Sequence, residues 1–462
     1  MKDVVVVGGG LAGLAAGWRL RHWDTVVLES GSRVGGRIRS ERRGRYWLNW
    51  GGHVFAGPGS STDALLNETG IAAAQVPGRL AALSMNGKLL LGGPIPAYPF
   101  RIPMSMSSRI ALVKAGIKVG AQVLRYASIV RRRPGEDPAV RQQRIYDFQN
   151  GRSFQDFVGE LPEDARALFY PTVTRSAADA HEISAGAGIG YFSLVFNIGQ
   201  GLSRGIVGGP STLTQVIAMA LGERVRLDAE VVEIVQTKRS AIVRYRQDGL
   251  DKQVEGRCVV LAVPAAVSHR VAVDLPADVR EALGAVRYGP YVSAAFLTDE
   301  PTPQPWDAAY GIATPKRSFN IVLNQSSIVR GREKTRQPGS SIMVFSPAGL
   351  ARTLLEQSDD EILRRYTDDL DRVLGSGFGR SVTEAEVQRW ETGAPYCFPG
   401  RGALQPTLTR GDGRIFLAGD YLGTLYTETA ISTGFSAAQE AASLLATERQ
   451  QRPVRGLPLA TG

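Results

Sequence analysis

This sequence is poor in the residues that build disulfide frameworks and metal sites. Its 462 residues include only two cysteines and four histidines. So few cysteines fit a reducing compartment and argue against disulfide staples. The histidines are scattered and show no metal-ligand spacing. We therefore expect a cytoplasmic protein that holds no metal ion.

Long apolar runs are also missing. The run Val4–Trp18 has no basic segment before it and no cleavage site, and it is shorter than the ~20 apolar residues of a membrane-spanning helix. We predict a soluble chain without a membrane span. Its 462 residues exceed one ordinary core, so two or more domains are expected.

Acidic residues are fewer than basic residues in this chain. The chain has 54 Lys and Arg against 44 Asp and Glu, which gives a formal net charge of +10. Such an excess attracts anionic partners. Because no basic tail or zinc spacing accompanies it, we expect a solvated basic surface and no nucleic-acid partner.

The most informative stretch is the N-terminal one. Val4–Val7 is a run of β-branched residues that predicts a buried strand, and Leu11–Leu20 predicts a helix. Between them, Gly8, Gly10 and Gly13 form the spacing G-x-G-x-x-G. The first glycine permits a tight turn, the second lets the backbone approach a pyrophosphate, and the third lets the helix close on the strand.

A second predicted strand, Thr25–Leu28, leads to Glu29 and Ser30. Glu29 follows Gly8 by about 20 residues, the position at which a carboxylate accepts the ribose hydroxyls of a dinucleotide. Strand, helix, second strand and acid together predict dinucleotide binding. The alternative is a glycine-rich turn that packs only on itself.

Two further glycine pairs follow. Gly36 ends the first pair and precedes Arg37, whose guanidinium can bind a phosphate through two parallel N–H groups. Gly51 and Gly52 end a short aromatic strand, where backbone can lie against a flat ring. His53 comes next, and a lone histidine is more often structural than catalytic.

These motifs resemble the flavin-containing amine oxidase superfamily, the group of monoamine and polyamine oxidases, protoporphyrinogen oxidase and carotenoid-type desaturases. The resemblance implies FAD rather than NAD. It also implies an α/β fold, with a Rossmann-like FAD-binding domain assembled from discontinuous segments and an inserted α+β substrate domain. The expected segments are 1–80, 205–280 and 385–447 for FAD, 81–204 and 281–384 for substrate, and a flexible tail at 448–462.

The C-terminal part supports this resemblance. Gly413–Asp420 reads as a strand that ends in Gly419 and Asp420, and a loop then enters a helix rich in small residues. The resemblance places Asp420 at the ribityl or phosphate end of FAD and Thr429 and Ala430 at the flavin. It also places the backbone of Val231 against adenine.

The catalytic residues are less clear from the resemblance. Amine oxidases of the group typically place a lysine near flavin N5, and here Ser293 occupies the matching position. This departure favours the branches that resemble protoporphyrinogen oxidase or the desaturases. Tyr426 matches one ring of the aromatic cage, whereas the other ring falls near Ala394, two residues from Tyr396.

The resemblance implies an enzyme that passes a hydride from a substrate C–H to flavin N5, with O2 or another acceptor reoxidising the flavin. No cysteine matches the covalent attachment point, so we expect non-covalent FAD and a small, largely apolar organic substrate. Two alternatives stay open. One is a non-catalytic lipid- or prenyl-binding protein on the same fold, and the other is an NAD-dependent dehydrogenase.

Ser107–Val130 has apolar residues at near-helical spacing and is followed by three arginines. Basic residues stabilise a helix C-terminus. We expect a core helix of the substrate domain, and peripheral contact with a membrane is the alternative.

Overall fold

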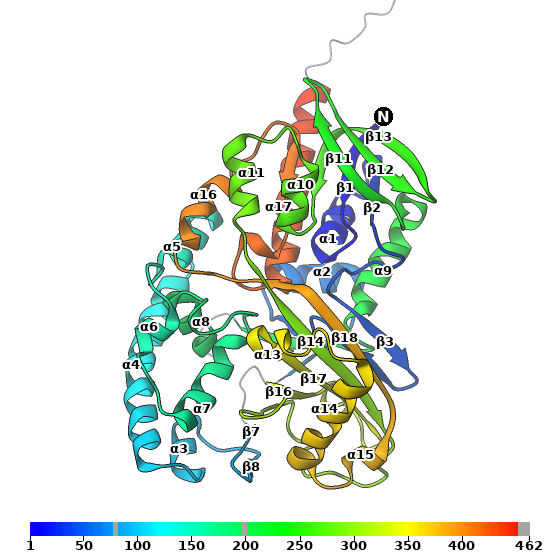
Figure 1. The fold of residues 1–462 in the computed structure, drawn as a ribbon. Helices are drawn as coiled ribbons and strands as arrows, with labels where there is room; N and C mark the ends of the chain where they lie inside the picture. Colours follow the sequence, from blue (N-terminus) through cyan, green and yellow to red (C-terminus); the bar gives the residue numbers. More distant parts are fainter. Residues whose placement is uncertain (77–81, 196–200, 451–462) are drawn as a thin grey trace, which may run out of the picture.

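The structure is a computed structural model that describes residues 1–76, 82–195 and 201–450. Two seven-stranded sheets dominate it, one at each end of the molecule in Figure 1. Helices cover both sheets, and a separate group of helices flanks the second sheet. The predicted α/β class is confirmed.

The first sheet has the order β10-β2-β1-β13-β12-β11, with β19 also paired to β13. Its strands are β1 (Lys2–Val7), β2 (Thr25–Leu28), β10 (Val225–Arg226), β11 (Glu230–Gln236), β12 (Ala241–Gln247), β13 (Leu250–Leu261) and β19 (Ile415–Leu417). The last half of β13 runs parallel to β1 and β19, and its first half pairs antiparallel with β12. The parallel part is buried on both faces, which explains its runs of valine.

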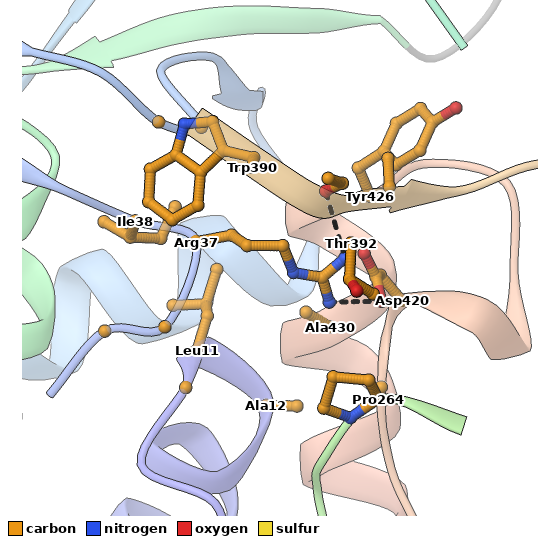
Figure 2. Close-up of a pocket in the computed structure, with 18 of the residues that line it drawn as sticks. Leu11, Ala12, Arg37, Ile38, Pro264, Trp390, Thr392, Asp420, Tyr426 and Ala430 are labelled. Atoms are coloured by element: carbon orange, nitrogen blue, oxygen red, sulfur yellow. Dashed lines mark hydrogen bonds and ion pairs between the residues drawn. The ribbon is translucent and has the colours of Figure 1, made fainter. Parts of the chain in front are cut away.

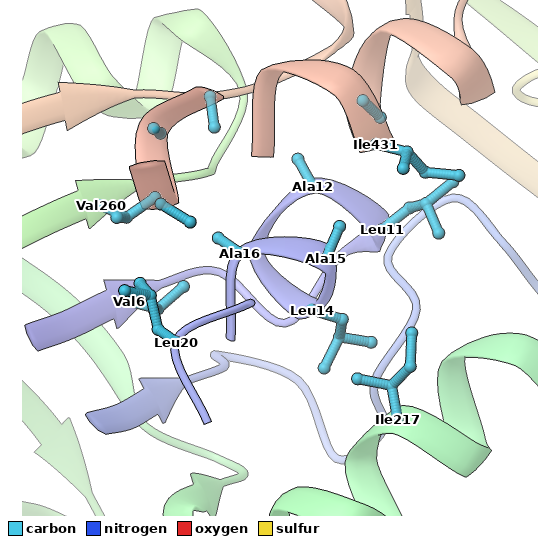
Figure 3. Close-up of a cluster of buried hydrophobic side chains, with 14 of the residues drawn as sticks. Val6, Leu11, Ala12, Leu14, Ala15, Ala16, Leu20, Ile217, Val260 and Ile431 are labelled. Carbon is cyan, nitrogen blue, oxygen red and sulfur yellow. The ribbon is translucent and has the colours of Figure 1, made fainter. Parts of the chain in front are cut away.

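Three helices form the core on one face of this sheet: α1 (Leu11–Arg19), α9 (Ser211–Leu221) and α17 (Thr427–Gln450). Figure 3 shows α1 between Ile431 of α17 and Ile217 of α9. A Cβ on Gly434 would lie 2.3 Å from the carbonyl oxygen of Ala12. The small residues of α1 and α17 therefore permit close backbone packing.

The second sheet has the order β18-β14-β17-β16-β15-β7-β8. Its strands are β7 (Ala82–Met85), β8 (Lys88–Leu90), β14 (Tyr288–Thr298), β15 (Gly311–Ala313), β16 (Ile321–Asn324), β17 (Ser340–Pro347) and β18 (Val382–Pro395). Helix α14 (Asp359–Leu374) packs its apolar face on this sheet. A capping box between Ser358 and Glu361 starts that helix.

The third layer is helical. It contains α4 (Met106–Val130), α5 (Pro138–Asp147), α6 (Phe154–Val158), α7 (Glu163–Thr174) and α8 (Ala185–Val195). Phe154, Phe169 and Phe192 stack at its centre, with ring centroids 4.5–6.1 Å apart. This cluster packs α6, α7 and α8 against one another.

Short elements complete the described chain. They are β3 (Ser40–Arg43), β4 (Tyr46–Asn49), β5 (Phe55–Ala56), β6 (Ala73–Gln75), β9 (Leu202–Ile206), α2 (Ser61–Thr69), α3 (Tyr98–Arg101), α10 (Ala265–Val271), α11 (Ala277–Gly284), α12 (Ser327–Arg330), α13 (Ala348–Arg352), α15 (Phe378–Ser381) and α16 (Gln405–Leu408). Helix α17 includes residues 448–450, which the sequence assigned to the tail, and Glu448 pairs there with Arg257. The rest of that tail, 451–462, lies outside the described residues.

Candidate active site

The glycine-rich turn joins β1 to α1, and its three glycines have different surroundings. Gly8 has a φ of +103°, and a Cβ there would lie 2.6 Å from the carbonyl oxygen of Ala262. A Cβ on Gly13 would lie 1.9 Å from the carbonyl oxygen of Gly8. Gly10, in contrast, has no atom within 4 Å of its Cβ position. The first and third glycines allow the chain to pack on itself, and the second leaves open space for a ligand.

The carboxylate of Glu29 is held against this turn at the end of β2. Its Oε2 accepts a hydrogen bond from the Gly9 N–H at 2.6 Å, and its Oε1 accepts one from the Gly31 N–H at 2.8 Å. Ser30 beside it is exposed. The carboxylate is thus oriented before any ligand arrives, in the position that suits ribose hydroxyls.

Arg37 and Asp420 meet across the chain. Nη2 of Arg37 lies 2.9 Å from Oδ1 of Asp420, and its Nη1 donates to the Gly393 carbonyl at 3.2 Å. Burial alone would lower the pKa of Arg37, but the Asp420 carboxylate and Tyr288 outweigh it and raise that pKa. Figure 2 shows the Arg37 side chain extending toward Asp420. The pair joins the predicted N-terminal and C-terminal motifs.

The second glycine pair carries the chain past Arg37. A Cβ on Gly51 would lie 2.2 Å from the Arg37 carbonyl oxygen, so only glycine fits there. Nδ1 of His53 lies 3.2 Å from the Gly51 carbonyl oxygen. Burial is the main cause that lowers the pKa of His53 to about 4; the hydrogen bond to Gly51 opposes this change, and the charge of Arg175 adds to it. His53 is therefore neutral at pH 7 and donates its Nδ1–H to Gly51.

A cavity of ≈ 570 Å³ joins these groups. The predicted residues that line it are Gly8, Gly10, Glu29, Ser30, Gly36, Arg37, Gly51, Gly52, His53, Val231, Ser293, Gly419, Asp420, Tyr426 and Ala430. Gly13 lies behind the glycine turn, and the Thr429 hydroxyl accepts a hydrogen bond from the Leu425 N–H at 3.0 Å. The open space at Gly10 and the preset Glu29 carboxylate fit the phosphate and ribose parts of FAD.

The far end of this cavity is aromatic. Tyr426 precedes α17 with a φ of +40°, a conformation that non-glycine residues rarely adopt. Its hydroxyl is hydrogen-bonded to that of Tyr191 in α8, and the ring centroids are 6.4 Å apart. Both tyrosines also line a smaller cavity of ≈ 80 Å³. The tyrosine pair therefore separates the two spaces.

The two other predicted catalytic residues lie in different places. The Ser293 hydroxyl faces the large cavity and donates to the Trp50 carbonyl at 2.7 Å. Ala394 also lines that cavity. Tyr396 does not, because β18 ends at Pro395 and the tyrosine ring packs in the helical layer, 6.5 Å from the Phe398 ring.

Four residues of the aromatic end were not predicted as site residues: Arg175, Tyr191, Tyr291 and Trp390. The Tyr291 hydroxyl donates to the Arg175 carbonyl at 2.5 Å, and its ring meets Phe345 edge-on at 5.6 Å. Phe345 also lines the cavity. Trp390 lies four residues before Ala394, the position that the resemblance assigns to the aromatic cage, but no sequence signal marks Arg175 or Tyr191.

The fold and site define a dinucleotide-binding protein of the Rossmann type. A parallel sheet, a glycine turn and a ribose-side carboxylate are its defining features. The cavity continues from them to Asp420 and α17, far beyond the first βαβ unit.

Comparison with known proteins identifies the class more closely. The family described as flavin containing amine oxidoreductase matches residues 11–442. Amine oxidase [flavin-containing] B of Sus scrofa is 27% identical over 474 residues, covering 95% of this chain and 85% of that protein. The Homo sapiens protein of the same name is 25% identical, with 95% and 85% covered.

Solved structures share the fold. Wild-type putrescine oxidase bound to putrescine has a TM-score of 0.74 and 20% identity, and the match covers 96% of this chain and 99% of that one. Cyclohexylamine oxidase from Brevibacterium oxydans has a TM-score of 0.74 and 16% identity, with the same coverage.

The chain therefore belongs to the flavin-containing amine oxidoreductase family. It is an FAD-dependent oxidoreductase, so the predicted family, enzyme class and cofactor are confirmed. The choice between FAD and NAD is decided in favour of FAD.

Proposed function

We propose that this protein oxidises small organic amines at the C–N bond, with FAD in the nucleotide part of the large cavity and substrate at the aromatic end. The observation that carries the proposal is the continuity of that cavity from Glu29 to Tyr426. FAD, when bound, supplies the acceptor for a hydride from the carbon beside the amine nitrogen. Glu29 and the turn at Gly10 hold its nucleotide part, and Arg37 with Asp420 holds the middle.

The aromatic end positions the amine and keeps water away. Rings of Tyr191, Tyr291, Phe345, Trp390 and Tyr426 line it. Aromatic faces attract cationic or polarised nitrogen groups, and a dry wall strengthens every polar contact inside it. The Tyr191–Tyr426 hydrogen bond closes this end. Ser293 has a hydroxyl where the amine oxidases of the group have a lysine amine. We assign it a structural role, in which it donates a hydrogen bond to the Trp50 carbonyl.

We propose that FAD is bound without a covalent link. Neither cysteine of the chain lines the large cavity: Cys258 is buried in β13, and Cys397 lines the smaller one. Burial also raises the pKa of the Cys397 thiol to about 11, so little of it is a nucleophilic thiolate at pH 7.

The two sheets correspond to two proposed domains. Strands of the first sheet come from the segments 1–80, 205–280 and 385–447. Most of the second sheet comes from 81–204 and 281–384, and β18 crosses the boundary at residue 385. We propose that the first unit binds FAD and that the second, with the helical layer, binds substrate.

The test is anaerobic mixing of the purified holoprotein with a panel of amines, porphyrinogens and polyenes. We expect amines to bleach the visible absorbance of the bound flavin, and air to restore it if O2 is the acceptor. Bleaching by porphyrinogens or polyenes alone would replace amine oxidation with C–C oxidation. A colourless protein that refuses FAD would overturn the proposal.

We also propose peripheral contact between α4 and a membrane. This helix lies on an outer edge of the molecule (Figure 1) and has two apolar stripes. One stripe is buried against the helical layer. The other is exposed and consists of Met106, Ile110, Val113, Ile117 and Leu124, at helical spacing. Contiguous exposed apolar side chains of this kind are typical of interaction surfaces.

The charge around α4 favours an anionic lipid surface as its partner. Residues 69–135 contain ten Lys and Arg and no Asp or Glu, although the whole chain has a net charge of only +10. A second copy of the chain would present the same charge and be repelled. Anionic lipids attract such segments. Within the described ranges, no helix is long and apolar enough to span a membrane.

Sedimentation with vesicles tests this contact. We expect the wild type to pellet with phosphatidylserine-containing vesicles at low salt, less so with pure phosphatidylcholine, and to be released by salt. The double variant Ile117→Glu, Leu124→Glu is expected to stay in the supernatant. Leu250→Glu, at an exposed leucine on β13, is the control. Equal pelleting of both variants, or a dimer that only the double variant dissociates, would contradict the proposal.

A further inference from the structure

Two arginines that line the large cavity, Arg37 and Arg175, differ in whether they have a carboxylate partner. Arg37 has its carboxylate, Asp420, at 2.9 Å. Arg175, at the C-terminal end of α7, has none: across the three described ranges, no Asp or Glu forms an ion pair with it or contributes to its pKa. The three undescribed segments contain no Asp or Glu either.

The surroundings of Arg175 leave its charge uncompensated. Its Nε is buried and has no hydrogen-bond partner in the described part of the chain. Burial lowers the pKa of Arg175 to about 10, and the hydroxyls of Tyr191 and Tyr291 oppose that change only in part. The side chain is still a cation at pH 7. An unpaired charge in such a place is costly.

The other charged residues that line the cavity are either paired or exposed to solvent. Glu29 is bound to the glycine turn, and Asp420 to Arg37. Glu230 and Arg270 also line the cavity, and both are exposed to solvent. The Arg37–Asp420 pair also acts on Tyr291 at the aromatic end, but those two charges compensate each other. Among the described lining residues of that end, Arg175 is the charged side chain without a carboxylate partner.

We infer that the substrate carries a carboxylate, and that Arg175 binds it while the amine lies among the aromatic rings. One guanidinium presents two parallel N–H groups that match the two oxygens of a carboxylate. A single free cation suits a monoanion better than a phosphate dianion. This inference rests on the proposed function and narrows its substrates to amines with an acidic group. It adds an anionic group to the largely apolar substrate that the sequence suggested.

The test compares amines with their carboxylated counterparts: phenethylamine with phenylalanine, tyramine with tyrosine, and propylamine with γ-aminobutyrate. We expect wild-type kcat/KM to favour a carboxylated member. In Arg175→Gln that preference is expected to fall by about 10- to 100-fold, mainly through KM, because a charge-assisted hydrogen bond is lost. Arg175→Lys keeps the positive charge but lacks the two parallel N–H groups. We expect this variant to show part of the wild-type preference for carboxylated substrates. Arg239→Gln, at an exposed turn residue, is the control.

Binding of benzoate to the holoprotein, measured by calorimetry, gives a readout that does not depend on turnover. We expect wild type to bind it and Arg175→Gln to bind at least about 10-fold more weakly. If Arg175→Gln does not fold, the inference is still tested by the wild-type kcat/KM values for the substrate pairs and by the Arg175→Lys variant. Oxidation of plain amines with rejection of their carboxylated partners, and no benzoate binding, would overturn this inference and leave amine oxidation standing. Failure of every amine would overturn the proposed function, and benzoate would then decide the role of Arg175.

Discussion

A Gly10→Val substitution is expected to leave the fold intact and to weaken FAD binding by at least about 100-fold. No atom lies within 4 Å of the Cβ position at Gly10, so the new side chain starts in open space. It fills the space through which a pyrophosphate approaches the backbone and the start of α1. Titration of the apoprotein with FAD, followed by flavin fluorescence, gives the affinity. Circular dichroism reports the fold.

Gly116→Val is the matched control. Gly116 is exposed on α4 and also has no atom within 4 Å of its Cβ position. We expect this variant to bind FAD as the wild type does. A Gly10→Val protein that kept full affinity would show that the cofactor does not approach this turn.

Gly13→Val is expected to destabilise the protein by at least about 4 kcal/mol, with little soluble protein recovered. A Cβ at Gly13 would lie 1.9 Å from the Gly8 carbonyl oxygen, which is backbone and cannot move aside. Helix α1 would have to leave β1, and its contacts with α9 and α17 would open (Figure 3). The midpoint and slope of urea unfolding of the apoprotein measure the loss.

Gly17→Ala in the same helix is the comparison. Its Cβ would meet the Cδ1 atom of Leu221 at 3.1 Å, and that atom is the end of a flexible side chain. We expect a change within about 1 kcal/mol, because alanine also favours the helix. If Gly13→Val unfolded at the same urea concentration as Gly17→Ala, the close approach of α1 to β1 would not limit stability.

These two variants separate functions that one motif combines. Gly10 serves the ligand and Gly13 serves the packing, although only three positions separate them. The sequence pattern alone predicts both needs, because a strand, a turn and a helix in succession fix the local geometry.

The same locality explains why the cofactor motifs were predictable. Glu29 follows β2 directly, and Gly419 with Asp420 follows β19. Parallel strands of one sheet bring their carboxyl ends to the same edge, so these residues reach one cavity. Residues that act at strand ends keep a fixed relation to the sheet.

Glu428 makes a contact that the local sequence pattern does not predict. It directly precedes Thr429 and Ala430, which the resemblance places at the flavin, but its carboxylate accepts hydrogen bonds from the N–H groups of Ser61 and Thr62 at 2.8 and 2.9 Å. It therefore stabilises the N-terminus of α2. That contact spans more than 360 positions of the chain, so no spacing rule predicts it.

By itself, the sequence determined the fold class, the family and the cofactor, because those depend on short motifs whose geometry is set within a few residues. Only the tertiary structure decided the substrate end. Tyr191 lies on α8 and Arg175 directly follows α7, two helices that the rings of Phe169 and Phe192 pack against each other. Tyr396 is turned away because β18 ends one residue earlier. Side chains that meet through the packing of separate layers leave no periodic signal in the chain.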